Sequence, residues 1–148
     1  MQPGKQLRVF VVDDEDVIAS TVATILRLQG GFRATSFTDP LKALEAAHVE
    51  PPDLIISDVV MPQLSGIELA VQVKESFPDC KILLFSGQAS TAHLLETARD
   101  KGHTFDLLLK PVHPADLLAK IRNLAGVTQQ PFLQESRSEL QAGTQKTE

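Results

Sequence analysis

Short runs of apolar residues alternate along this chain with longer segments in which apolar residues recur every three or four positions. The apolar runs predict five β-strands, at residues 7–12, 32–37, 54–58, 81–86 and 105–109. The amphipathic segments predict five helices, at residues 16–29, 40–48, 65–76, 91–101 and 114–125. Strict alternation of strand and helix indicates a parallel sheet with helices on both faces and right-handed crossovers. We therefore expect an α/β fold with a doubly wound parallel sheet.

Several helix ends carry local signals. Asp39 followed by Pro40 is typical of a helix start, with an acid as the N-cap and proline at the first position. Ser65 and Glu68 have the spacing of a capping box. Gly126 follows the last amphipathic segment and predicts its end.

The first amphipathic segment, residues 16–29, has a clear helical pattern. Val17, Thr21, Ile25 and Leu28 lie in one helical stripe. The prediction of a helix here rests on that stripe.

Composition and charge narrow the class of protein. The 148 residues are 43% hydrophobic, which is ordinary for one globular domain. The net charge of −5 argues against direct binding of nucleic acid. A single cysteine, Cys80, excludes an intramolecular disulfide, and no apolar run is long enough for a membrane helix, so we expect a cytoplasmic protein without membrane insertion.

The chain divides into three expected parts. Residues 7–126 hold all the predicted strands and helices and form the expected domain. Residues 1–6 are a short N-terminal extension. After Gly126 the composition becomes polar and rich in glutamine, so residues 127–148 are expected to be a flexible tail.

Chemically active side chains follow four of the predicted strands. Asp13 and Asp14 follow the first strand, Asp58 ends the third, Ser86 ends the fourth and Lys110 follows the fifth. In an open parallel sheet these ends share one edge, where doubly wound folds bind ligands. Three carboxylates there suit a divalent cation, and a lysine and a hydroxyl suit phosphoryl oxygens.

Taken one at a time, the same residues have simpler interpretations. Asp13 and Asp14 could cap the first helix, since acids are common at that position. Ser86 with Gly87 could be a turn, and Lys110 could be a solvated surface lysine. The functional interpretation rests on their combination at one sheet edge.

The combination resembles the receiver domain of two-component response regulators, in its stand-alone form similar to the chemotaxis regulator. The resemblance covers residues 7–125 and is carried by Val11-Val12-Asp13-Asp14, Asp58 with Met61-Pro62 and Gly66, Ser86-Gly87, and Lys110-Pro111. It implies a flavodoxin-like sheet with strand order 2-1-3-4-5. It also implies that the chain is a signalling module rather than an enzyme with a separate substrate.

The resemblance implies a role for each matching residue. Asp58 would accept a phosphoryl group from a histidine kinase or a histidine phosphotransfer protein. Magnesium would be held by the carboxylates of Asp14 and Asp58, by the backbone carbonyl of Val60, and through water by Asp13. The phosphorylated surface would then bind a downstream protein.

Further roles concern the other side of the expected site. Ser86 and Lys110 would stabilise the phosphoryl group, and the peptide bond before Pro111 would be cis. Ser86 would also begin a switch whose second member, usually aromatic in this family, is Leu107 in this chain. Phe105, two residues earlier on the same strand face, is a possible substitute.

Two other functions share either the chemistry or the fold. A magnesium-dependent phosphohydrolase of the haloacid dehalogenase type also forms an aspartyl phosphate, but it has a second acid where this chain has Val60. A flavin or nucleotide binder would need a glycine- or hydroxyl-rich loop after the first strand. Here that loop begins with Asp13-Asp14-Glu15, whose charge would repel phosphate.

Overall fold

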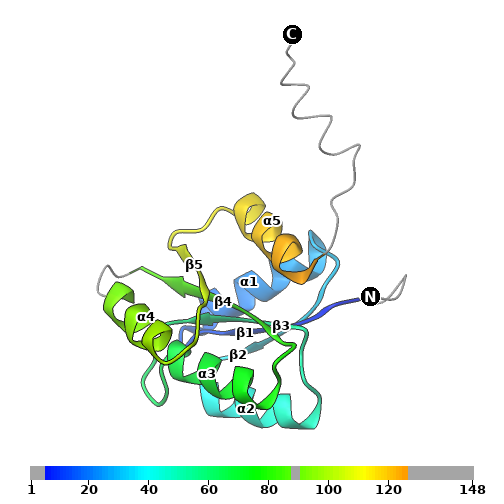
Figure 1. Cartoon of the computed structure of the whole chain (residues 1–148). Helices are drawn as coiled ribbons and strands as arrows, with labels where there is room; N and C mark the ends of the chain where they lie inside the picture. Colours follow the sequence, from blue (N-terminus) through cyan, green and yellow to red (C-terminus); the bar gives the residue numbers. More distant parts are fainter. Residues whose placement is uncertain (1–5, 88–90, 127–148) are drawn as a thin grey trace.

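The computed structural model describes residues 6–87 and 91–126. Within this part five parallel strands form one sheet in the order β2-β1-β3-β4-β5 (Figure 1). The strands are β1 (Arg8–Val12), β2 (Arg33–Phe37), β3 (Leu54–Asp58), β4 (Lys81–Ser86) and β5 (Asp106–Leu109). The helices are α1 (Asp16–Leu28), α2 (Pro40–Val49), α3 (Gly66–Ser76), α4 (Thr91–Asp100) and α5 (Pro114–Ala125). The flavodoxin-like fold and its strand order are confirmed.

The ends of the chain were assigned to an extension and a tail from composition alone. Most of the expected extension at residues 1–6 and the whole expected tail at residues 127–148 lie outside the described residues. The expected domain at residues 7–126 contains every strand and helix named above.

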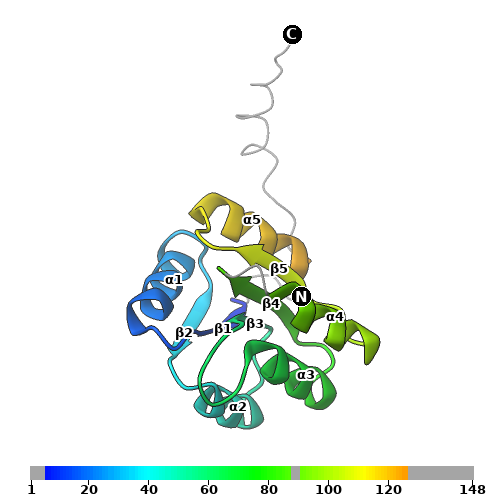
Figure 2. The same ribbon diagram turned by 90° about the vertical axis from the view of Figure 1, so that its left-hand side faces the viewer.

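Helices cover both faces of the sheet (Figures 1 and 2). On one face α1 and α5 pack over a cluster that includes Val11, Ile56 and Ile121. On the other face α2, α3 and α4 pack over a second cluster that includes Phe10, Ile55 and Leu84. Successive strand residues alternate between the two clusters, so each central strand contributes to both cores.

Strand β3 lies in the middle of the sheet, between β1 and β4. Its first four residues are buried, and Asp58 at its carboxyl end is half-buried. The register places Asp58 opposite Phe85, one residue before the end of β4. A continuous apolar strand covered on both faces therefore delivers Asp58 to the edge where β1 and β4 also end.

The helix starts follow the local signals in the sequence. The Asp39 side chain accepts a hydrogen bond from the amide of Leu41. At α3, Ser65 and Glu68 form both bonds of the capping box. Gly126 ends α5 in the left-handed conformation, with φ of 75°, which favours glycine.

The apolar stripe of α1 is not the face that packs on the sheet. The buried residues of this helix are Ala19, Ala23 and Leu26, whereas Val17 and Leu28 of the stripe are 75% and 80% exposed. Two alanines on the inner face let the helix approach the sheet closely. Val17 and Leu28 remain outside and Ile25 is only partly buried, so the stripe predicted the helix correctly but not its orientation.

Several boundaries of strands and helices differ from the expected ones by one residue. The expected strand at 105–109 begins at Asp106, so Phe105 lies just before it. The Phe105 side chain still packs, like that of Leu107, against the core on the side of α2, α3 and α4. The two possible switch residues therefore share a face, as strand alternation predicted.

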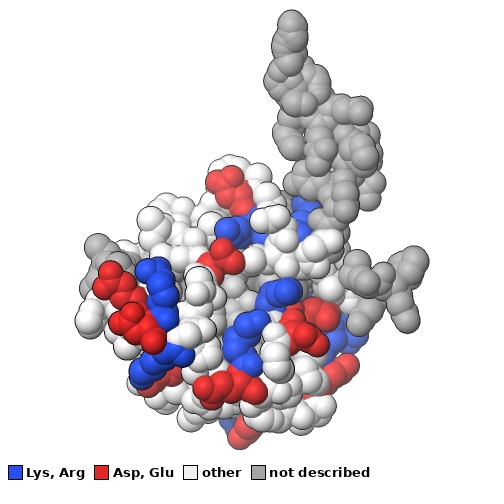
Figure 3. Space-filling model, in the orientation of Figure 1, with Lys and Arg blue, Asp and Glu red and all other residues white. Residues whose placement is uncertain are grey.

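The surface shows no segregation of charge on the face seen in Figure 3. Lysine and arginine side chains are interspersed there with aspartate and glutamate side chains. None of the described helices is both long enough and apolar enough to cross a membrane.

Candidate functional site

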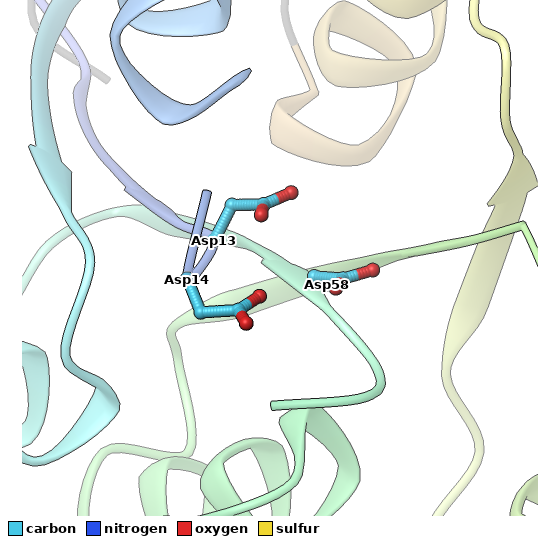
Figure 4. A group of neighbouring side chains, drawn as sticks. All are labelled: Asp13, Asp14 and Asp58. Carbon is cyan, nitrogen blue, oxygen red and sulfur yellow. The ribbon is translucent and has the colours of Figure 1, made fainter. Parts of the chain in front are cut away.

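Three aspartates meet at the carboxyl edge of the sheet (Figure 4). Asp13 and Asp14 follow β1, and Asp58 ends β3. One carboxylate oxygen from each lies within 4.8 Å of the others. Because β1 and β3 are neighbouring parallel strands, their ends bring together residues separated by more than forty positions in the sequence.

The donors suit a small divalent cation. Magnesium prefers oxygen ligands at about 2.1 Å, and it is commonly held by one or two carboxylates together with water. The oxygens of Asp13, Asp14 and Asp58 are close enough together to surround one such ion. Val60, whose carbonyl was expected to be a further ligand, lies in the loop after Asp58 and is exposed.

Lys110 joins two of the acids. Its Nζ lies 3.0 Å from Oδ2 of Asp13 and 3.2 Å from Oδ1 of Asp58. Its backbone amide donates to the carbonyl of Ser86 at 2.8 Å, which links the ends of β4 and β5. The peptide bond between Lys110 and Pro111 is cis.

Asp13 belongs to the acidic site and does not cap α1, because the N-cap of that helix is Glu15, without a side-chain cap hydrogen bond. Oδ1 of Asp13 accepts a hydrogen bond from the amide of Glu15, at the start of α1. Its Oδ2 pairs with Lys110, and the residue is buried. One oxygen of this carboxylate therefore holds the turn that leads into α1, and the other pairs with Lys110 at the acidic site. The resemblance assigned Lys110 to the phosphoryl group and did not predict its pairing with Asp13.

Burial and charge act in opposite directions at this site. Burial raises the pKa of the Asp58 carboxyl, the charge of Lys110 works to lower it, and the nearby charges of Asp13 and Asp14 add to the increase, so the pKa is above its ordinary value. Burial alone would lower the pKa of Lys110. Its hydrogen bond to Asp13 and the charge of Asp58 outweigh this effect, so the pKa of Lys110 is raised and it stays charged.

Ser86 and the possible switch residues occupy different surroundings. Ser86 is buried at the end of β4, next to the strand that carries Asp58. Leu107 lies opposite Leu84 of β4, and it is partly buried against the core beneath α2–α4. The Phe105 ring stacks on that of His103, with centroids 6.0 Å apart. Leu107 and Phe105 are therefore not part of the site formed by the three aspartates.

One polar residue near the site was missed by the sequence reasoning. Ser57 immediately precedes Asp58, is buried, and donates a hydrogen bond from its hydroxyl to the carbonyl of Asp58. The available signal was a single hydroxyl inside the apolar run at 54–58.

Comparison of the sequence with known proteins identifies related chains. The family model of the response regulator receiver domain matches residues 9–122. The response regulator receiver protein CpdR of Brucella abortus is 32% identical over 117 residues, which cover 79% of this chain and 95% of that protein. The probable transcriptional regulatory protein TcrX of Mycobacterium tuberculosis is 29% identical over 128 residues, which cover 84% of this chain but only 53% of that protein.

A solved structure of a chemotaxis protein has a similar fold. The chemotaxis protein CheY4 of Vibrio cholerae is 27% identical, with a TM-score of 0.70. The match covers 81% of this chain and 99% of that one. The match with CpdR extends over nearly the whole of that protein, whereas TcrX continues well beyond the matched part.

Proposed function

Because the chain belongs to the response regulator receiver domain family, the phosphoacceptor signalling modules of two-component systems, we propose that Asp58 is the residue that accepts the phosphoryl group. The observation that carries this proposal is the position of the Asp58 carboxylate. It lies at a strand end, 3.2 Å from the Lys110 ammonium and beside the carboxylates of Asp13 and Asp14.

The chemistry follows from this arrangement. An oxygen of the Asp58 carboxylate attacks the phosphorus of a phosphohistidine, forming a P–O bond as the P–N bond breaks and the electron pair leaves with the imidazole nitrogen. Lys110 turns from Asp58 toward a phosphoryl oxygen as negative charge arrives. The Ser86 hydroxyl donates to another of these oxygens.

Receiver domains bind Mg²⁺ at an acidic pocket, and the three aspartates here form one. We assign Asp14, Asp58 and the carbonyl of Val60 as direct ligands, with Asp13 acting through water. When bound, the ion neutralises the acids and the incoming phosphoryl oxygens, because three carboxylates alone would repel a dianion.

The family implies a histidine kinase as phosphodonor partner, and we propose its docking place. An apolar groove of about 410 Å³ lies beside Lys110, between α1 and the segment after β5. Its lining includes Ile18, Ile25, Val112 and Leu117. A groove continuous with Lys110 lets a protein bound there present its phosphohistidine to the acidic edge.

We propose that the chain acts in the cytoplasm as a signalling protein. It becomes phosphorylated, binds a downstream protein and turns over no separate substrate. The absence of a second acid at Val60 argues against a phosphohydrolase. The single cysteine is in keeping with a reducing compartment.

The test is labelling by a small-molecule phosphodonor, such as phosphoramidate, in the presence of Mg²⁺. The wild-type chain should take up one phosphoryl group, labile to hydroxylamine, and Asp58→Asn should take up none. Asp79→Asn, at an exposed aspartate outside the acidic site, is the matched control and should label normally. Full labelling of Asp58→Asn would contradict the assignment, and continuous hydrolysis of the donor would favour the phosphohydrolase.

A further inference from the structure

Ser57 brings a hydroxyl into an apolar part of the core. It is 1% exposed and lies on the same strand face as Ile55, toward α2 and α3. Its partners in the register are Val12 on β1 and Leu84 on β4, both apolar. A hydroxyl in such surroundings needs a hydrogen-bond acceptor, because burying it without one is costly.

The acceptor is the backbone of the proposed phosphoacceptor. The Ser57 hydroxyl donates to the carbonyl oxygen of Asp58 at 2.9 Å. At the other end of the same peptide group, the amide of Val59 donates to the carbonyl of Phe85 at 3.0 Å. The peptide group between Asp58 and Val59 is therefore held at both ends, by Ser57 and by strand β4.

The start of α3 closes on the same carbonyl. A Cβ atom at Gly66 would overlap the carbonyl oxygen of Asp58 and come within 3.0 Å of the Ser57 hydroxyl oxygen. The amide of Gly66 donates to the carbonyl of Val59 at 2.8 Å. Glycine at this position lets the helix start, the hydroxyl and the Asp58 carbonyl pack as one unit.

We propose that Ser57 is a positioning residue for phosphoryl transfer to Asp58. Its hydroxyl fixes the orientation of the Asp58–Val59 peptide group, and this orientation sets the direction of the Asp58 side chain toward Lys110. It also sets the path of the loop that leads to Val60. The inference rests on the proposed function, since it concerns the aim of the phosphoacceptor.

The central experiment compares Ser57→Ala with the wild-type chain. Two quantities are measured at a temperature where both are folded by circular dichroism: the labelling rate with phosphoramidate at saturating Mg²⁺, and the Mg²⁺ dissociation constant by calorimetry. We expect a labelling rate lower by about tenfold, because small misplacements of reacting groups are costly. We also expect weaker Mg²⁺ binding. Ser57→Thr keeps the hydroxyl and should restore most of the rate.

Ser20→Ala is the matched control. The Ser20 hydroxyl also donates to a backbone carbonyl, that of Asp16 at 2.7 Å, but on the exposed side of α1. Its loss should leave both the labelling rate and the Mg²⁺ affinity unchanged. Gly66→Ala is a second, independent test, because it pushes on the Asp58 carbonyl from the α3 side and should also slow labelling.

The outcomes distinguish failure of this inference from failure of the proposed function. If Ser57→Ala lowers the melting temperature but labels and binds Mg²⁺ like the wild type, Ser57 is only a satisfied core hydroxyl and the inference is wrong. A folded Gly66→Ala variant that labels at the wild-type rate would also overturn it. If the wild-type chain itself does not label, the proposed function fails instead.

Discussion

At the scale of single residues, the acidic edge is a balance between like charges and one lysine. Lys110 pairs with Asp13 and Asp58, and Asp14 brings a third carboxylate into the same space. Two like charges 4 Å apart repel by about 4 kcal/mol at an effective dielectric constant of 20. The raised pKa of Asp58 is the consequence of its burial and of this crowding, only partly offset by Lys110.

This balance predicts how stability depends on pH when Mg²⁺ is removed. An ordinary aspartate has a pKa of 3.8, and that of folded Asp58 is higher. Between the two values the folded state binds the proton more tightly, so ionisation of Asp58 destabilises the fold as the pH rises. Asp58→Asn cannot ionise. Its free energy of unfolding relative to the wild type should therefore increase from pH 4 toward pH 7.

Urea unfolding in EDTA, followed by circular dichroism at each pH, measures this difference. Saturating Mg²⁺ is the control, because the ion stabilises the ionised carboxylate and should reverse the order of the two proteins at pH 7. A difference between the proteins that stays constant from pH 4 to pH 7 in EDTA would contradict the raised pKa.

At the scale of elements, α1 has two apolar faces with different uses. Ala19, Ala23 and Leu26 pack on the sheet. Val17 points to solvent one helical turn before Thr21, which lines the groove beside Lys110. The helix thus contributes to the core with one face and to the proposed docking surface with the other.

A charge on the outer face of α1 should impair transfer from a protein but not from a small molecule. Val17→Glu should slow labelling by any histidine kinase that phosphorylates the wild-type chain, while labelling by phosphoramidate stays normal. Val49→Glu is the matched control, because Val49 is 86% exposed at the end of α2, on the other face of the sheet. Equal kinase rates for the two variants would place the partner elsewhere.

The elements after β4 include the two residues proposed for a switch. Leu107 and Phe105 are both partly buried against the core beneath α2–α4. Leu107 buries less surface than an aromatic residue would and has no hydroxyl to expose. A switch requires two discrete packings close in free energy, and Leu107 biases them only weakly.

We therefore predict that phosphorylation acts mainly on the 87–92 loop and α4. Of this loop, residues 88–90 lie outside the described residues. Amide hydrogen exchange of the unmodified and beryllofluoride-bound proteins should change most between residues 87 and 101. Changes confined to residues 105–109 would show that the fifth strand carries the signal instead.

At the scale of the whole molecule, the acidic site brings together the ends of strands that are far apart in the sequence. Asp13 and Asp14 extend β1, Asp58 ends β3 and Lys110 follows β5. A cation bound among the acids would link the ends of β1 and β3 in the folded state only. Its binding free energy therefore adds to the stability of the whole domain.

Magnesium should raise the melting temperature of the wild-type chain. At 100 times its dissociation constant a ligand of the folded state adds about 2.7 kcal/mol, which corresponds to roughly 10 °C for a domain of this size. Asp14→Ala should remove most of that increase, and it should also raise the melting temperature without metal, because it relieves repulsion. Calorimetric melting with and without Mg²⁺ tests this, with Asp79→Ala as control. A wild-type melting temperature insensitive to Mg²⁺ would exclude the metal site.

The order of strands and helices could be predicted from the sequence, because hydrophobic periodicity and helix caps are local properties. For example, Asp39, Ser65 and Gly126 each cap the end of a helix next to them in the chain. The grouping of Asp13, Asp14 and Asp58 was also predictable, since the ends of parallel strands share one edge. The strand order itself came from the family resemblance rather than from periodicity.

Other features depend on how the elements pack, and only the tertiary structure decided them. The inward face of α1 could not be read from its apolar stripe, because Ala19 and Ala23 pack closely on the sheet while Val17 remains outside. The pairing of Lys110 with Asp13, 97 positions away, depends on the register of the four strands from β1 through β3 and β4 to β5. The start of α3 lies against the Asp58 carbonyl that accepts the Ser57 hydroxyl bond, and this close approach requires glycine at position 66. Such contacts between distant segments have no local signature in the sequence.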